Sequence, residues 1–219
     1  MKKLLMVVSA ADSLTLADGS SHPTGFWAEE VVESVRVLRE AGVEVTLATP
    51  GGVVPTVDKA SLDGTFDDAV ASLEDLRSPV SLSDVDAGSF NAVYLPGGHG
   101  PMADLAFDKT LGALLADFHD NGKVVAALCH GPAGLLSAVR ADGTFVFAGK
   151  EIAVFTDEEE RQGGLNVPYS VAERLTSLGA RLSGGEPWSS TVVVDGTLVT
   201  GQNPQSTVAT AARVAGLLA

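Results

Sequence analysis

Cysteine and positive charge are both scarce in this sequence. Cys129 is the only cysteine among 219 residues, so the chain cannot form an internal disulfide, which fits a reducing compartment and predicts a cytoplasmic protein. Acidic residues outnumber basic ones by 28 to 14, and the formal net charge is −14. Because nucleic acids and anionic membrane surfaces demand a basic face, we predict no nucleic acid and no membrane among the partners.

Long apolar runs are missing as well. No stretch approaches the roughly 18 apolar residues that a membrane-spanning helix needs. The opening MKKLLMVVSA is basic and then apolar, but its apolar part is too short for a secretory signal and no clear cleavage site follows it. We expect it to contain the first buried strand. The length fits one α/β domain, and we expect a single domain over residues 1–219.

Strand-like apolar segments alternate with helix-like segments along the chain. Strands are predicted at 3–10, 43–50, 92–100, 123–129 and 151–155, with a hairpin through Asp195-Gly196 within 190–201. Helices are predicted at 24–42, 66–77, 108–122, 131–139, 168–180 and 204–218, with an acidic turn or helix at 156–163. This alternation indicates an α/β fold in which helices cover both faces of a mostly parallel sheet.

The segment KVVAALCHGPAG (123–134) places Cys129 where a predicted strand gives way to a helix. Ligands of parallel α/β sheets bind outside the carboxyl ends of the strands. Ala127 and Gly131 flank the cysteine at the small-x-nucleophile-x-small spacing that a tight nucleophile elbow requires. A helix N-terminus beside a thiol lowers its pKa. A lone cysteine is often just a small buried hydrophobe, but this spacing and position favour a nucleophile.

Glu30 differs from the other acidic residues of its predicted helix. Most charged residues of the segment 24–42 share one exposed stripe at helical spacing. Glu30 lies off that stripe, at helical spacing from Trp27, Ser34 and Val37. A carboxyl group in such an apolar setting has a raised pKa and can donate or shuttle a proton. We therefore consider Glu30 a candidate partner of Cys129, with a boundary glutamate lying along the surface as the alternative.

Two further side chains are candidates for the same site. His130 follows the cysteine directly and is a candidate general base, or else a polar residue at a helix start. In FTDEEE (155–160), Thr156 and Glu159 have the spacing of a capping box. Glu160 is not needed for that cap, so it is a candidate to orient His130 as the third member of a catalytic set. The alternative for Glu160 is a solvated acidic helix start.

A glycine-rich segment, LPGGHG (95–100), ends another predicted strand. Its glycines, Gly97 and Gly98, leave backbone N–H groups to face the pocket, as an oxyanion hole needs. The chain has no GxGxxG and no lysine in Walker-type spacing, which disfavours phosphate binding. Because His22, His99 and His119 show no close metal-ligand spacing, we predict no metal site.

Several of these segments together resemble a known family. ALCHGPAGLL, preceded by LPGGHG, is similar to the signature of the DJ-1/PfpI superfamily, which has the class I glutamine amidotransferase-like fold. TGFWAEE, REAGVEVTLATPGG, FTDEEE, NVPYSVAERLTSLGA and VVVDGTLVTGQNPQS extend the resemblance over nearly the whole chain. They are similar specifically to the heat-shock-protein-31-like glyoxalase III branch. The resemblance implies a flavodoxin-like three-layer sandwich, a strained elbow at the nucleophile and a homodimer.

The resemblance also implies a reaction and the residues that perform it. It assigns the nucleophile, its carboxyl partner, the adjacent base and the third acidic residue to Cys129, Glu30, His130 and Glu160. It assigns the backbone oxyanion donors to Gly98 and His99. The branch implies a glutathione-independent glyoxalase of the D-lactate dehydratase type. Such an enzyme converts methylglyoxal or glyoxal to the 2-hydroxy acid through a cysteine hemithioacetal, without a cofactor.

Other functions of the superfamily stay open at this point. The chain departs from the branch at VVES (31–34), where a Pro-Tyr pair often follows the glutamates, and it lacks the longer insertions of chaperone-type relatives. A glutamine amidotransferase-like hydrolase would need a late His-x-Glu pair, but no histidine follows His130. A stress-response holdase, a redox sensor in which Cys129 is oxidised, and a protein deglycase remain alternatives.

Overall fold

A seven-stranded sheet forms the centre of the computed structural model, which describes residues 1–219. The strand order is β10-β11-β7-β6-β1-β4-β5, and every neighbouring pair is parallel except β10 with β11. The strands are β1 (Lys3–Val7), β4 (Glu44–Thr49), β5 (Val80–Ser81), β6 (Ala92–Leu95), β7 (Val124–Leu128), β10 (Val192–Asp195) and β11 (Leu198–Gly201). Without the edge strands β5 and β10, the five inner strands have the chain order 2-1-3-4-5 of flavodoxin-like folds. The predicted fold class is confirmed.

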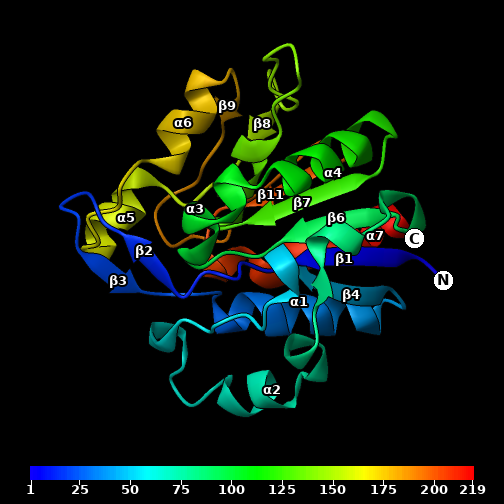
Figure 1. The fold of residues 1–219 in the computed structure, drawn as a ribbon, viewed down its shortest axis with the longest axis horizontal. Helices are drawn as coiled ribbons and strands as arrows, with labels where there is room; N and C mark the ends of the chain where they lie inside the picture. Colours follow the sequence, from blue (N-terminus) through cyan, green and yellow to red (C-terminus); the bar gives the residue numbers. More distant parts are fainter.

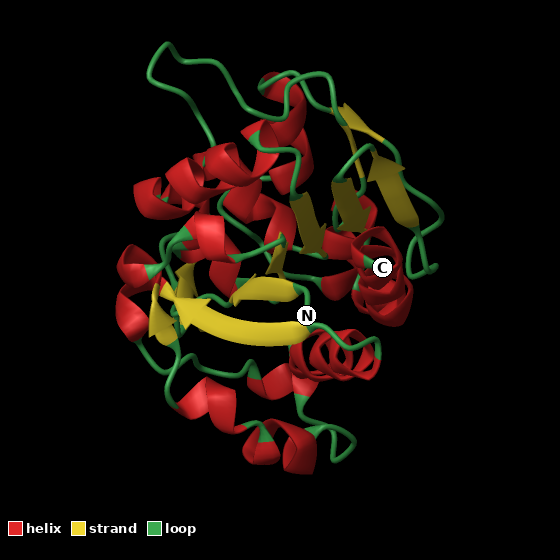
Figure 2. Cartoon of the chain, turned by 90° about the vertical axis from the view of Figure 1, so that its right-hand side faces the viewer, coloured by secondary structure: helices red, strands yellow, loops and turns green.

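Helices cover both faces of this sheet (Figures 1 and 2). They are α1 (Ala28–Glu40), α2 (Asp67–Ser72), α3 (Gly100–Ala103), α4 (Lys109–Asp120), α5 (Asp157–Gly163), α6 (Val171–Ser177) and α7 (Thr207–Leu218). Successive strand residues point to opposite faces. In β1, Leu4 and Met6 therefore pack with α1 and α7, whereas Leu5 and Val7 pack with α4 and α6. All four side chains are fully buried, and the result is the predicted three-layer sandwich.

Short 3-10 helices occupy many of the connections between these elements. They span Pro50–Gly52, Lys59–Ser61, Glu74–Arg77, Leu82–Asp84, Ala87–Ser89, Leu105–Phe107, Gly131–Ser137 and Pro204–Ser206. The helix predicted at 131–139 is one of these, η7 (Gly131–Ser137), so that prediction was wrong in type. At Gly131 the backbone runs close to β6, since a Cβ there would lie 2.1 Å from the carbonyl oxygen of Leu95. The chain is pressed against the end of β6 where an α-helix would have to begin.

Other sequence predictions differ from the structure in detail. The predicted helix at 66–77 is split by Leu73, whose backbone is not helical, into α2 and the 3-10 helix Glu74–Arg77. The strand predicted at 151–155 is only β8 (Glu151–Ile152), which pairs with β9 (Arg181–Leu182) outside the main sheet. A hairpin of β2 (Ser13–Thr15) and β3 (Ser21–Pro23) was not predicted, because neither strand carries an alternating apolar pattern.

Several local predictions are confirmed. The hairpin through Asp195-Gly196 joins β10 to β11, and Gly196 has a φ of 66°. Gly42 follows α1 with a φ of 78°, as a glycine just past a helix does. Arg36 on the exposed face of α1 pairs with Glu33 and Glu40 at 2.8 Å each. None of the helices combines the length and the apolar character needed to cross a membrane.

Candidate active site

Cys129 lies on a strained turn at the carboxyl end of β7. Its φ is 59°, in the left-handed region that non-glycine residues rarely adopt, at a cost of roughly 1–2 kcal/mol. Two hydrogen bonds hold it there. The Cys129 N–H donates to the Gly201 carbonyl at 3.0 Å, and its carbonyl accepts from the Phe155 N–H at 3.0 Å. The elbow predicted from the spacing of small residues is present, and neighbouring segments on both sides fix its shape.

Glu30 projects from the first turn of α1 toward this elbow and is fully buried. One carboxyl oxygen, Oε2, accepts the Gly97 N–H at 2.7 Å, while the other, Oε1, is buried without a hydrogen-bond partner. Burial raises the pKa of Glu30 to about 8, against the opposing effects of the Gly97 N–H and the Cys129 thiol. The predicted burial and raised pKa are confirmed, and the side chain is a neutral carboxylic acid at neutral pH.

This contact corrects one expectation about the glycine-rich loop. Gly97 was predicted to present its N–H to the pocket as an oxyanion donor, but that N–H is directed to Glu30. The N–H of the next residue, Gly98, faces the Cys129 sulfur instead. The loop therefore divides its donors between two groups, with one N–H holding the carboxyl group and the next available at the nucleophile.

The thiol of Cys129 also differs from the sequence prediction. A helix N-terminus was expected to lower its pKa, but the pKa is raised well above its ordinary value. Burial is the main cause. Glu30 adds to it through its hydrogen bond to the thiol and through its charge once it ionises, and the N–H groups of Gly98 and His130 oppose it only in part. The thiol is therefore protonated at neutral pH, and forming a thiolate requires a proton acceptor within reach.

His130 is the nearest candidate acceptor. Its Nδ1 lies 3.5 Å from the Cys129 sulfur, and its Nε2 lies 2.7 Å from Oε2 of Glu160. Burial, followed by the charge of His99, lowers the pKa of His130 to about 4, so the ring is neutral at neutral pH. An ionised carboxylate can only accept, so we assign the ring proton to Nε2. That tautomer leaves the lone pair of Nδ1 facing the thiol.

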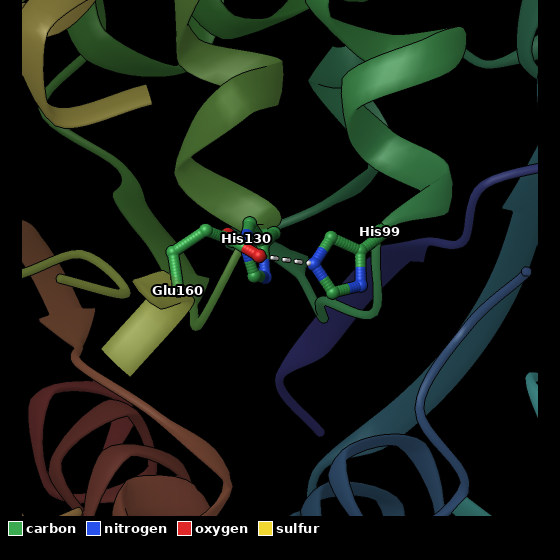
Figure 3. Close-up of side chains that lie close together, drawn as sticks. All are labelled: His99, His130 and Glu160. Atoms are coloured by element: carbon green, nitrogen blue, oxygen red, sulfur yellow. Dashed lines mark hydrogen bonds and ion pairs between the residues drawn. The ribbon is translucent and has the colours of Figure 1, made fainter. Parts of the chain in front are cut away.

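Glu160, in α5, holds two imidazole rings at once. His99 Nε2 lies 3.0 Å from its Oε1, and His130 Nε2 bonds to its Oε2 (Figure 3). Burial acts to raise the pKa of Glu160, but the hydrogen bonds from His130 and His99 outweigh it and hold the pKa at about 2. The structure thus brings Glu160 to His130 as the sequence predicted. It also places the side chain of His99 in the site, although the family resemblance assigned only a backbone role to this residue.

Three possible metal ligands lie together beside the elbow. The spacing of the histidines along the chain indicated no metal cluster, yet one ligand atom from each of His99, His130 and Glu160 lies within 4.8 Å of the others. The residues come from three separate elements, so their spacing in the sequence carried no signal of this grouping.

A family model for the DJ-1/PfpI family matches residues 22–215, a range that includes the elbow, the glycine-rich loop and all four candidate side chains. The chain belongs to the DJ-1/PfpI family. Glyoxalase 3 of Candida albicans is 31% identical over 234 residues, covering 96% of both chains. A crystal structure of glyoxalase III from the same organism has a TM-score of 0.83 with 28% identity, covering 100% of this chain and 98% of that one.

Two further relatives carry different names. The glutathione-independent glyoxalase HSP31 of Saccharomyces cerevisiae is 28% identical, over 97% of this chain and 96% of its own. The protein/nucleic acid deglycase HchA of Pseudomonas aeruginosa is 30% identical, over 93% of this chain and 76% of its own. The chain is therefore similar to DJ-1/PfpI proteins named as glyoxalases and to one named as a deglycase. The pocket beside Cys129 helps to distinguish these two activities.

In this DJ-1/PfpI chain the thiol opens into a cavity of about 300 Å³. Aromatic side chains make up much of its wall: Phe155 packs on the His130 ring at 4.5 Å between centroids, and Trp188 packs edge-on against Phe155 at 5.5 Å. Trp188 has a φ of 62°, and its N–H and indole N–H are held by Glu159 and Gln162. Sequence analysis missed this wall, because nothing in the local pattern places Trp188 beside Cys129.

Proposed function

We propose that this protein is a glutathione-independent glyoxalase, which converts methylglyoxal or glyoxal to the corresponding 2-hydroxy acid. The observation that carries the proposal is the neutral carboxylic acid of Glu30, buried beside a cysteine on a strained elbow. A glyoxalase must move a proton between two adjacent carbons, and a carboxyl group with a pKa near the working pH suits that task. The names of the Candida and Saccharomyces relatives support the same reaction.

The proposed reaction begins with thiolate formation. His130 Nδ1 accepts the Cys129 proton, and the resulting imidazolium is paired with the Glu160 carboxylate. The thiolate adds to the aldehyde carbon. The backbone N–H groups of Gly98 and His99 hold the alkoxide that forms, and Glu30 donates its proton to it. The product of this step is a hemithioacetal beside an ionised Glu30.

The second half of the reaction moves a carbon-bound proton. The Glu30 carboxylate removes the proton from the former aldehyde carbon. The His130 imidazolium protonates the oxygen on the adjacent carbon, which gives an enediol, and the neutral ring then takes the proton of the neighbouring hydroxyl. Glu30 then delivers its proton to the adjacent carbon, which leaves a thioester of the 2-hydroxy acid on Cys129. Water hydrolyses the thioester and restores the thiol, and the imidazolium proton returns to Glu30. Every proton in these steps comes from the substrate, from water or from the three side chains.

The test is D-lactate formation from methylglyoxal without glutathione. Wild type is expected to form D-lactate, Cys129→Ser to form none, and Glu30→Gln to lose about 10²–10⁴-fold, the range that general acid–base catalysis supplies. Circular dichroism of each variant verifies folding. Absence of D-lactate from folded wild type, or full activity in Cys129→Ser, would overturn the proposal.

A deglycase is the second candidate, and the size of the cavity favours it. About 300 Å³ lies at the lower end of the roughly 300–1,000 Å³ of pockets that bind drug-sized molecules, which is more than three-carbon methylglyoxal needs. A glyoxalase also shortens the life of glycated adducts, because it consumes the aldehyde that they release. Adduct decay faster than spontaneous release, lost in Cys129→Ser, would favour the deglycase. Decay no faster than release favours the glyoxalase alone.

We also propose that the protein acts in the cytoplasm as a homodimer on a small 2-oxoaldehyde. The buried free thiol of Cys129 is suited to a reducing compartment. Sedimentation velocity tests the homodimer, and a species of single-chain mass at cellular concentration would contradict it.

A further inference from the structure

We propose that His99, His130 and Glu160 form a binding site for a divalent transition-metal ion, with Zn²⁺ as the preferred ion. Two imidazoles and one carboxylate are a set of ligands that zinc takes in catalytic proteins, where a fourth position stays open to water. Imidazole also favours zinc and its neighbours over Mg²⁺ and Ca²⁺, which prefer oxygen ligands. The site lies in the same cavity as Cys129 but uses different atoms from those that face the thiol.

The distances fit such an ion with small adjustments. Zinc bonds to nitrogen and oxygen are about 2.0–2.2 Å, so neighbouring ligand atoms in a tetrahedral shell lie about 3.3 Å apart. The His99 and His130 Nε2 atoms lie 3.0 and 2.7 Å from the two oxygens of Glu160. The ligand atoms of all three residues lie within 4.8 Å of one another, so the two imidazoles would also have to close in around the ion. Figure 3 shows the Glu160 carboxylate beside the two rings. The cavity beside them leaves room for water at the fourth position.

The three ligands are held by separate, well-anchored elements. His130 follows Cys129, whose backbone is hydrogen-bonded to β11 and to Phe155. His99 is the residue immediately before α3. Glu160 lies in the first turn of α5, which a capping box between Thr156 and Glu159 fixes. Ligands that are positioned before the ion arrives lose little entropy on binding, and a net charge of −14 attracts cations to the surface.

Occupancy of this site has a consequence for Cys129, which rests on the proposed function. In the metal-free tautomer, His130 Nε2–H donates to Glu160 and Nδ1 is free to accept the thiol proton. A metal ion takes the lone pair of Nε2, so the ring proton moves to Nδ1, where it faces the sulfur. His130 then has no position left to accept the proton of the thiol. Bound zinc and a proton-accepting His130 therefore exclude each other.

Calorimetric titration of the full chain with Zn²⁺ tests the site without reference to turnover. Wild type is expected to bind one ion per chain, to ignore Mg²⁺, and to give the visible absorption of four-coordinate Co²⁺. His99→Ala is expected to weaken zinc binding more than about a hundredfold, since losing even an outer-shell partner costs ten- to a hundredfold. His119→Ala is the matched control, because His119 packs against Phe147 instead of lining the cavity. It is expected to bind zinc as wild type does.

Cys129→Ser decides which atoms hold the ion. Retained zinc affinity in this variant supports the His99–His130–Glu160 site, whereas lost affinity would place the ion on the thiol and overturn the proposal. No binding to wild type, or equal binding in His99→Ala, would also overturn it. The calorimetry stands even if the chain forms no D-lactate. If the chain is active, loss of D-lactate formation on zinc addition, restored by a chelator, is expected, and undiminished activity at full occupancy would refute coordination by His130 Nε2.

Discussion

Replacing Glu30 by glutamine should make the stability of the protein less sensitive to alkaline pH. The glutamic acid is fully buried, and its pKa is about 8 in the folded protein against 4.5 for the ordinary group. The unfolded chain therefore releases this proton near pH 4.5, whereas the folded chain keeps it until about pH 8. Because folding favours the protonated form, the contribution of Glu30 to stability is complete below pH 4.5 and is lost as the pH rises toward 8.

The magnitude follows from the size of the shift. Between the two pKa values the wild type loses about 1.4 kcal/mol of stability per pH unit through this one group. Glutamine does not titrate, so the variant is free of this loss. The free energy of unfolding of Glu30→Gln minus that of wild type should therefore grow by about 3 kcal/mol between pH 5 and pH 7. Any fixed cost of the amide, such as a hydrogen that finds no acceptor, is the same at both pH values and cancels.

Urea unfolding of both proteins at pH 5 and pH 7 measures this difference. Ser34→Ala is the control, because Ser34 lies on the same buried side of α1 and donates to the Tyr94 hydroxyl at 2.9 Å. Its loss should destabilise the protein by the same amount at both pH values. A difference for Glu30→Gln that does not change with pH would show that the folded protein holds Glu30 ionised. The proton-donor role assigned to it would then be wrong.

Three other results are expected from the same geometry. The profile of kcat/KM should fall below about pH 4, where His130 becomes protonated, and above about pH 8, where Glu30 loses its proton; a rate that climbs through pH 8 would contradict the mechanism. Glu160→Gln should lower kcat by at least about 10²-fold, because an amide has one oxygen to accept from two imidazoles; unchanged alkylation kinetics of the thiol in this variant would argue against the assigned tautomer. Gly98→Ala should destabilise the protein far more than Gly143→Ala does. Both glycines have φ near 85°, but a Cβ at Gly98 would lie 2.3 Å from a carbonyl oxygen, whereas a Cβ at Gly143 would meet nothing within 4 Å. Gly143→Ala should cost roughly 1–2 kcal/mol, the cost of a side chain in the left-handed region, and equal losses in urea unfolding would refute the close-approach argument.

What could be predicted from the sequence is what depends on local pattern. The inner strands were found because each is a short, continuous apolar run flanked by turn residues. The elbow was found because Ala127 and Gly131 leave room for a tight turn around Cys129. Glu30 was found because its helical neighbours are largely apolar, and burial on one side of a helix follows from helical periodicity. These inferences needed no contact between distant segments.

The features that were missed depend on contacts between distant segments. The His99 side chain contacts the carboxylate of Glu160, 61 residues away on α5, and no local spacing in the sequence predicts that contact. The pKa of the Cys129 thiol was predicted in the wrong direction because burial, its main cause, is a property of the packed core. The type of the helix after Cys129 was also predicted wrongly, in a segment that packs closely against Leu95 of another strand. The sequence shows which chemical group each residue carries, but the packed surroundings of that group determine its protonation state.

Two carboxyl groups in one pocket show how those surroundings assign roles. Glu30 receives one N–H on Oε2 and no hydrogen bond on Oε1, and burial raises its pKa to about 8. Glu160 receives an imidazole N–H on each oxygen, and its pKa falls to about 2 despite partial burial. The first is therefore able to give up a proton and take it back near neutral pH, whereas the second stays charged and fixes the histidine tautomer. Because the number of donors separates the two, removing the ring donor at His99 should raise the pKa of Glu160 and weaken its hold on that tautomer. The His99 side chain thus supports the nucleophile without touching it, through its hydrogen bond to Glu160, that of Glu160 to His130, and the contact of His130 with the thiol.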